Sequence, residues 1–388
     1  MFANGSADRN ATEFNVGGLP RSKLDEFNEI CNRLKKTPVA LPKLFIYKVQ
    51  RNEDDHICCA DVQKNLSHYA VGMNSSEISV FPIDQRALFN LDREVSSSSH
   101  VRKFVLDREQ RSSNQQRDAQ MNAINERLLE QQPRPISLIG HSDRVVEVRF
   151  LNDCQRLLSC SADCLVKLWN IGGQEESQGL NQNRLCSSFD AHLQPIWTLD
   201  VNALDSHFAT GSRDHSARLF ALDRKEVLRV FSGHTGPVNT VRFHSNCKYL
   251  ASGASDRTVR MWDVNNGNLV RVFTGHRQEI YSLAFSPSGK FIASSGEDCS
   301  IMIWDISAGK LICQVPQTPH TLSINSLQFS SDGNLLVSSS IDKLVCVWNL
   351  QSLQDSNFRL ECLLSKDTGI QLRRTAFTHP DLLIGVGT

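Results

Sequence analysis

The segment "GHTGPVNTVRFHSNCKYLASGASDRTVRMWD", residues 233–263, contains the pattern that decides the fold. Its pieces "NTVRFH" and "YLASGAS" predict a half-buried strand followed by a strand of small residues, and "VRMWDV" predicts the next strand outward. His234 precedes Asp256 by 22 residues, and Trp262 follows Asp256 by six. The segment therefore predicts three short antiparallel strands with polar side chains at one end.

The same spacing recurs in five copies, which start 42 to 51 residues apart. In each copy a His comes first, an Asp follows after 22 residues, and an aromatic residue follows six residues later. The copies are His141, Asp163 and Trp169; His192, Asp214 and Phe220; His234, Asp256 and Trp262; His276, Asp298 and Trp304; and His320, Asp342 and Trp348. A fixed internal spacing with variable connections indicates a structural repeat.

Four short strands per repeat, with the letters G-H and W-D at fixed positions, resemble the blades of WD40-repeat proteins. This resemblance implies an all-β fold, a seven-bladed WD40 β-propeller. A weaker first copy keeps Phe81 at the aromatic position and Ser75 at the Asp position, but has Glu53 in place of the His. The segment "GIQLRRTAFTHPDLLIGVGT" at the end of the chain supplies two more strands, and "KLFIYKVQ" (residues 43–50) is expected to join them. The predicted ring is thus closed by N- and C-terminal strands side by side, which removes exposed sheet edges.

A Ser or Thr stands four residues before each of the five repeated Asp residues. These hydroxyl residues are Ser159, Thr210, Ser252, Ser294 and Ser338. Together with the His, Asp and Trp of the same copy they are expected to form a buried hydrogen-bonded network, because buried polar groups must be paired. The alternative is a Ser-His-Asp hydrolase site, but catalysis needs one exposed nucleophile and an oxyanion hole rather than five repeated sets. We expect no catalytic residue, and a shorter network in the copy that ends in Phe220, which has no indole N–H.

The composition excludes several other classes of function. Lys+Arg and Asp+Glu are 42 each, so the formal net charge is zero, and direct nucleic-acid binding is not expected. No apolar run is long enough for a membrane helix, and the first residues lack the features of a signal peptide. The 12 cysteines have no C-x-x-C pair, with Cys58–Cys59 and Cys160…Cys164 the closest groupings. Neither a metal nor another cofactor is therefore expected.

Three regions are predicted along the chain. Residues 1–40 form a polar N-terminal segment with one candidate helix, "RSKLDEFNEICNRLKK", which either packs on the propeller or binds a partner. Residues 41–388 form the propeller. Residues 85–134, rich in Ser, Gln and Arg, are expected to be a mobile insertion between the third and fourth strands of the first blade.

Several segments closely resemble the sequences of the TBP-associated factor 5 family. They are "VRFHSNCKYLASGASDRTVRMWD", "LVRVFTGHR" and the ending "LLIGVGT". The segment "SLAFSPSGKFIASSGEDCSIMIWDISAG" resembles the SAGA-type paralogue more than the TFIID subunit. Forty residues are too few for the helical domain that precedes the propeller in this family. The resemblance implies a nuclear, non-enzymatic scaffold that contacts histone-fold TAF subunits and other subunits of a histone acetyltransferase coactivator complex.

Charged residues beside the repeated His and Asp positions are candidates for such contacts: Arg144, Arg213, Arg257, Arg277, Glu297 and Lys343. The alternative is that they are ordinary solvated loop charges, which are common on any protein surface. Other functions are open because one fold serves many functions. A TFIID subunit, an adaptor of a ubiquitin ligase and a reader of modified histones all remain, although a reader needs an aromatic or acidic cage and the loops contain few aromatic residues.

Overall fold

The computed structural model describes residues 43–49, 56–83, 101–106, 135–172, 184–315, 318–350, 360–379 and 382–387. The candidate helix of the first 40 residues and Glu53 lie outside this part. The chain divides into two units, Met1–Ala40 and Leu41–Thr388. All regular elements among the described residues are β-strands apart from a single residue in a helical turn, and no helix among them is long and apolar enough to cross a membrane.

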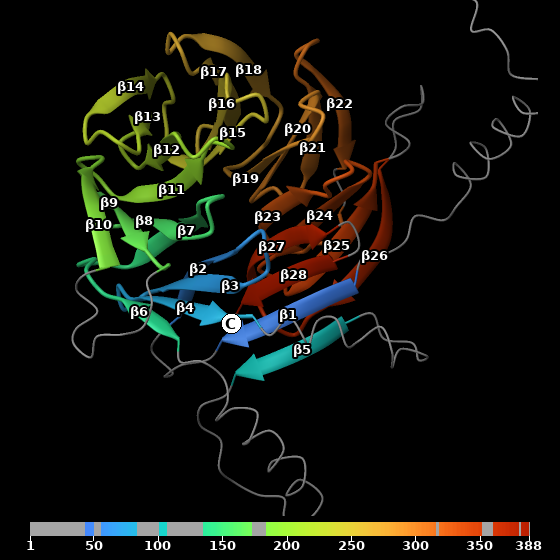
Figure 1. Cartoon of the computed structure of the whole chain (residues 1–388). Helices are drawn as coiled ribbons and strands as arrows, with labels where there is room; N and C mark the ends of the chain where they lie inside the picture. Colours follow the sequence, from blue (N-terminus) through green and yellow to red (C-terminus); the bar gives the residue numbers. More distant parts are fainter. Residues whose placement is uncertain are drawn as a thin grey trace, which may run out of the picture. The chain divides into compact units, whose positions relative to one another are not determined.

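The second unit is an all-β propeller (Figure 1). Six of its four-stranded sheets, here called blades 1 to 6, are built from strands that follow one another along the chain and pair antiparallel. Blade 1 contains β2 (Ile57–Val62), β3 (His68–Met73), β4 (Ile78–Pro82) and β6 (Ile136–Leu138). Blade 2 contains β7 (Val145–Phe150), β8 (Arg156–Ser161), β9 (Leu165–Asn170) and β10 (Leu185–Asp190). Blade 3 contains β11 (Ile196–Val201), β12 (His207–Ser212), β13 (Ser216–Ala221) and β14 (Val227–Ser232).

Blades 4 to 6 repeat this plan. Blade 4 contains β15 (Val238–Phe243), β16 (Tyr249–Ala254), β17 (Thr258–Asp263) and β18 (Leu269–Thr274). Blade 5 contains β19 (Ile280–Phe285), β20 (Phe291–Gly296), β21 (Ile301–Asp305) and β22 (Lys310–Val315). Blade 6 contains β23 (Ile324–Phe329), β24 (Leu335–Ser340), β25 (Leu344–Asn349) and β26 (Glu361–Asp367).

A further four-stranded sheet joins segments from both ends of the second unit. Its strands, in spatial order, are β27 (Leu372–His379), β28 (Leu382–Gly387), β1 (Lys43–Val49) and β5 (Val101–Leu106). The strand β1 lies beside β28 and runs parallel to it, with Lys43 opposite Leu382 and Lys48 opposite Gly387. The strand β5 comes from the predicted insertion at 85–134; the rest of that insertion, up to residue 134, lies outside the described residues, and its mobility stays a prediction.

The first strand of each sheet contacts the first strands of the neighbouring sheets, in the order β2, β7, β11, β15, β19, β23 and β27. The strand β27 contacts β23 on one side and β2 on the other. Side chains between neighbouring blades form the core, and each cluster mixes residues of two adjacent sheets. One cluster, for example, contains Phe189 from blade 2 and Phe208 and Phe220 from blade 3. The first strands thus lie side by side in the order of the chain, and the strand β27 of the further sheet contacts both β23 and β2.

Every inner strand carries the same irregularity, a register shift after its first residue. In β11, for instance, Ile196 pairs with Ser212 and Thr198 pairs with Gly211, so Trp197 is the extra residue of a β-bulge. A bulge turns the side chain of the extra residue away from the direction that strict alternation would give. The seven bulge residues are Cys58, Val146, Trp197, Asn239, Tyr281, Asn325 and Arg373.

Candidate functional site

The repeated polar residues meet in each of blades 2 to 6 at one end of the sheet. The His Nδ1 lies 2.7 to 2.8 Å from the Asp carboxylate in four blades, and 3.4 Å in blade 6. The His Nε2 lies 2.7 to 2.8 Å from the Ser or Thr hydroxyl in all five. The indole Nε1–H of Trp169, Trp262, Trp304 and Trp348 donates to the same Ser oxygen at 2.8 to 2.9 Å.

The electrostatics of the network assign its protons. Burial alone would raise the pKa of Asp298, but hydrogen bonds from His276 and from backbone N–H groups lower it to about 2. The carboxyl is therefore ionised and accepts a hydrogen bond from the Nδ1–H of His276. Nε2 then accepts from the Ser294 hydroxyl, and Ser294 accepts from the Trp304 indole. The network is a chain of single donors and acceptors with every group paired.

Two copies depart from this arrangement. In blade 3, Phe220 supplies no donor, and its ring stacks on Phe208 with 5.0 Å between ring centroids, so the network ends at Thr210. In blade 1, Phe81 stacks on Tyr69 at 5.0 Å, and Val71, which replaces the Ser, is fully buried. Apolar packing thus takes the place of the polar chain where the sequence pattern is degraded.

A hydrolase site is not compatible with this geometry. The hydroxyl residues Ser159, Thr210, Ser252, Ser294 and Ser338 are each 0% exposed, so a substrate could not reach their oxygens. Nucleophilic catalysis requires the attacking oxygen to face the substrate. Among the described residues, no group of three or more His, Cys, Asp and Glu side chains is arranged to hold a metal ion. The repeated residues form hydrogen bonds that connect the turns and strands of blades 2 to 6.

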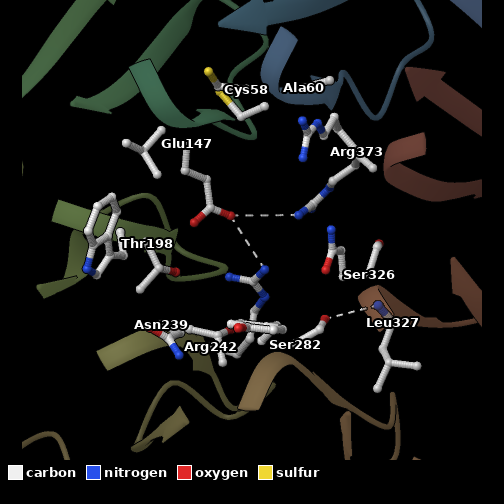
Figure 2. Close-up of a pocket in the computed structure, with 17 residues that line it drawn as sticks. Cys58, Ala60, Glu147, Thr198, Asn239, Arg242, Ser282, Ser326, Leu327 and Arg373 are labelled. Carbon is white, nitrogen blue, oxygen red and sulfur yellow. Dashed lines mark hydrogen bonds and ion pairs between the residues drawn. The ribbon is translucent and has the colours of Figure 1, made fainter. Parts of the chain in front are cut away.

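The candidate interaction site is a pocket of about 140 Å³ at the centre of the inner strands (Figure 2). All seven bulge residues line it, together with the residue that follows each of them. Two of the seven are aromatic, Trp197 from blade 3 and Tyr281 from blade 5, with Asn239 of blade 4 between them in the order of the blades. The guanidinium of Arg144 lies 5.3 Å from the centre of the Trp197 ring. Our sequence interpretation considered aromatic residues in the loops only, and therefore missed these two, which come from strands.

Six charged side chains gather on the inner strands, and three of them, Glu147, Arg242 and Arg374, line the pocket. Arg149 forms an ion pair with Glu147 and lies 3.7 Å from Asp61 and 3.4 Å from Asp200. Arg242 lies 3.5 Å from Glu147. Arg374, on β27, lies 3.3 Å from Asp61 and 3.9 Å from Glu147. Three positive and three negative groups thus balance one another across five inner strands, β2, β7, β11, β15 and β27.

Burial and neighbouring charges shift the pKa values of Glu147 and Arg374. Burial would raise the pKa of Glu147, but the three arginines and the N–H of Leu199 lower it. Burial, with Arg149 nearby, lowers the pKa of Arg374 to about 10, so this guanidinium still carries its charge at neutral pH. With three arginines and three carboxylates, the cluster has no formal net charge.

Polar side chains of the inner strands also connect each blade to the next. The Glu147 carboxylate accepts from Leu199 N–H at 2.7 Å, and Asp61 accepts from Phe150 N–H at 2.9 Å. Farther along, Thr198 Oγ1 accepts from Val241 N–H at 3.2 Å, and Ser282 Oγ accepts from Leu327 N–H at 3.0 Å. These bonds fix the stagger of neighbouring inner strands. The sequence signal for them is a polar residue at the third or fifth position of an otherwise apolar strand, and our sequence interpretation did not use it.

The charged residues predicted to contact partners all lie at the end of the blades where the His and Asp residues meet. Arg144 and Arg277 are in the loops that precede β7 and β19. Arg213, Arg257, Glu297 and Lys343 are in the turns between the second and third strands of blades 3 to 6, and all six residues are exposed. Arg257 and Lys343 adopt left-handed backbone conformations, with φ of 66° and 67°. The structure thus places these six candidates on one end of five adjacent blades.

Comparison with known families agrees with this geometry. The family model "WD domain, G-beta repeat" matches residues 133–170, 183–220, 225–263, 267–305 and 312–349. The chain is a WD40-repeat protein. The matched ranges contain all five copies of the His, Asp and aromatic spacing, and each range ends at the aromatic residue or directly after it.

Among relatives, this WD40-repeat protein is 27% identical over 182 residues to transcription initiation factor TFIID subunit 5 of Encephalitozoon cuniculi, which covers 46% of the chain and 27% of the relative. It is 34% identical over 97 residues to eukaryotic translation initiation factor 3 subunit I of Aspergillus terreus, covering 25% of the chain and 26% of the relative. The corresponding subunit of Saccharomyces cerevisiae is 31% identical over 87 residues, 22% of each. The aligned part spans about a quarter of each relative's own length.

Proposed function

We propose that this WD40-repeat protein is a non-enzymatic scaffold subunit of a SAGA-type histone acetyltransferase coactivator complex. In this role it supports histone acetylation and transcription by RNA polymerase II in the nucleus, through contacts with histone-fold TAF subunits and other coactivator subunits. The observation that carries the proposal is the similarity to TFIID subunit 5, which covers about twice as much of the chain as the matches to the translation factor subunits. The shorter matches fall within the length of two or three blades and support the fold more than a shared function.

The preference for SAGA over TFIID rests on the sequence of residues 282–309 alone. A TFIID subunit in preinitiation complex assembly is the second candidate, and the relative named above supports it directly. An adaptor of a ubiquitin ligase is the third, since a propeller with this network could serve it equally well.

We also propose that the sheet β27–β28–β1–β5 is the seventh blade, and that it closes the ring. The parallel pairing of β1 with β28 and the contacts of β27 with both β23 and β2 support this closure. Residues 85–134 would then be an insertion in blade 1 that lends β5 to the closing blade, and residues 1–40 a separate segment. The six exposed charges named above would provide the contacts with partners.

Affinity purification of the tagged full chain from nuclear extract, followed by mass spectrometry, tests the proposal. Recovery of an acetyltransferase together with histone-fold subunits would support it. Recovery of TBP with the other TFIID subunits would favour the second candidate, and recovery of cullin components would favour the third. A variant with the charges of Arg144, Arg213 and Arg257 reversed should recover fewer subunits. If it recovers the intact complex, these residues are solvated loop charges.

A further inference from the structure

Four of the exposed arginines lie on four consecutive blades. Arg144 belongs to blade 2, Arg213 to blade 3, Arg257 to blade 4 and Arg277 to blade 5. The inner strands of these blades contact one another in the same order, β7, β11, β15 and β19. All four residues are in loops or turns at the end of the blades where His and Asp meet. They therefore form a basic arc, one arginine per blade, on a chain whose net charge is zero.

The backbone of this arc is fixed while its side chains are exposed. The N–H of Arg277 donates to the Asp298 carboxylate at 3.1 Å. The N–H of Arg213 donates to the Pro195 carbonyl in the loop before β11 at 3.0 Å, and the N–H of Arg257 donates to the Ala254 carbonyl of its own turn at 3.2 Å. Within the described ranges, none of the four guanidinium groups forms an ion pair with an acidic side chain. By contrast, Arg149, Arg218, Arg242 and Arg374 all pair with carboxylates. The backbone of the arc is therefore held in place, and its guanidinium groups form no ion pair within the described part of the chain.

Apolar surface accompanies these charges. Leu193 follows the repeated His192 in the loop before β11, and it is 92% exposed, the largest value among the exposed hydrophobic residues of the described ranges. Trp197 lies four residues after Leu193 in the sequence. Its side chain is half-buried and lines the pocket, and the Arg144 guanidinium lies over its ring. A ligand that made only ionic contacts with the arginines would leave the exposed Leu193 side chain in contact with water.

We propose that the basic arc binds an acidic peptide segment of a partner protein, one that carries large apolar side chains among its carboxylates. The carboxylates pair with Arg213, Arg257 and Arg277, and an apolar side chain packs on Leu193. Each guanidinium offers planar donors that match a carboxylate. This inference rests on the proposed function, because it names the chemistry of the partner that the scaffold holds.

Nucleic acid is the other polyanion that could bind arginines, and two observations favour the peptide. Glu297 is exposed beside Arg277 on blade 5, and Asp143 is exposed beside Arg144 on blade 2. Acidic groups at both ends of the arc would repel a continuous phosphate backbone, whereas a short peptide can place its charges between them. The exposed Leu193 also has no counterpart in phosphate binding.

The test uses the purified full chain and a short dye-labelled peptide in which Asp and Glu alternate with Leu and Phe. Fluorescence anisotropy measures its dissociation constant for the unchanged chain and for the triple variant R213Q/R257Q/R277Q. Exposed ion pairs each contribute modestly, so the triple variant should bind about tenfold more weakly. The matched control is R224Q/K225Q, which removes two exposed cations from the turn between β13 and β14 at the opposite end of blade 3. This control should bind the peptide as the unchanged chain does.

A second variant, Leu193→Ser, should weaken binding several-fold without changing its dependence on salt. Equal binding by the triple variant, or equal binding of a peptide with Lys in place of its acidic residues, would overturn the proposal. So would binding of a short DNA duplex in preference to the peptide. Urea unfolding of each variant checks that the fold is unchanged. Because the assay contains no other subunit, its failure leaves the purification result untouched, and failure of the purification leaves the peptide result standing.

Discussion

The Ser252 oxygen takes part in two hydrogen bonds that join different strands, from the Trp262 indole at 2.8 Å and with His234 at 2.7 Å. Replacing Trp262 by Phe removes one donor and part of a fully packed ring. We expect this change to lower the free energy of unfolding by about 1–3 kcal/mol, measured by urea denaturation. The control is Trp197→Phe, since Trp197 is half-buried at the pocket, and its effect should be smaller. Equal effects of the two changes would show that the indole N–H contributes nothing.

Two glycines at equivalent turns offer a matched test of backbone strain. Gly289 and Gly333 have φ of 68° and 75°, a region that costs other residues about 1–2 kcal/mol. A Cβ at Gly289 would lie 2.6 Å from the His244 ring, whereas at Gly333 the nearest atom, in Pro287, is 3.6 Å away. We therefore expect Gly289→Ala to lower the free energy of unfolding by about 1–2 kcal/mol more than Gly333→Ala does, because His244 must move and its bond to the Gly289 carbonyl weakens. Equal losses in thermal unfolding would contradict this.

At the scale of the element, the His-Asp pairs make the stability of each blade depend on pH. Burial lowers the pKa of His192 and of His320 below the usual value of 6.5. The unfolded chain therefore binds these protons first, and the contribution of the neutral imidazoles is present above pH 6.5 and is lost as the pH falls below it. Asp298, whose pKa is lowered to about 2, contributes stability above its usual value of 3.8, and this is lost between about pH 4 and 2.

Urea denaturation at a series of pH values should thus show two phases of acid destabilisation. Replacing His320 by Gln should reduce the slope of the first phase, whereas the part of the second phase that comes from Asp298 in blade 5 should remain. A slope near pH 6 that is the same in this variant would exclude His320 as its source.

Sequence spacing predicted the blades well because each blade repeats the same buried network, so its residues must recur at fixed positions. The bulge residues could not be predicted in the same way. Trp197, Asn239 and Arg373 occupy equivalent positions in their strands, yet they share no chemistry, since a bulge fixes the direction of a side chain and not its identity. The repeat spacing also could not predict that β1 pairs parallel with β28. It indicated only that the two segments lie side by side.

At the scale of the whole molecule, Arg374 connects the end of the chain to the beginning of the ring. Its guanidinium lies near Asp61 of blade 1 and Glu147 of blade 2. Replacing Arg374 by Met leaves these partly buried carboxylates with less compensation, and we expect a loss of about 3 kcal/mol in the free energy of unfolding. The double change R374M/E147Q should recover part of this loss, because it removes one of the uncompensated charges. Arg373→Met, the neighbouring control, should cost less, since Arg373 donates a single hydrogen bond to the Ile57 carbonyl.

The pairing of β1 with β28 also has a consequence for synthesis. The strand β1 leaves the ribosome first among the strands of its sheet, and its partner β28 is made last. While the six blades are being translated, the edge of β1 that will pair with β28 stays unpaired. The other edge can pair with β5, which is made early. Unpaired edges invite pairing with other chains. In growing chains on one messenger RNA, β1 of one chain can therefore pair with a strand of a neighbouring chain. The slowest step in folding should be the pairing of β28 with β1.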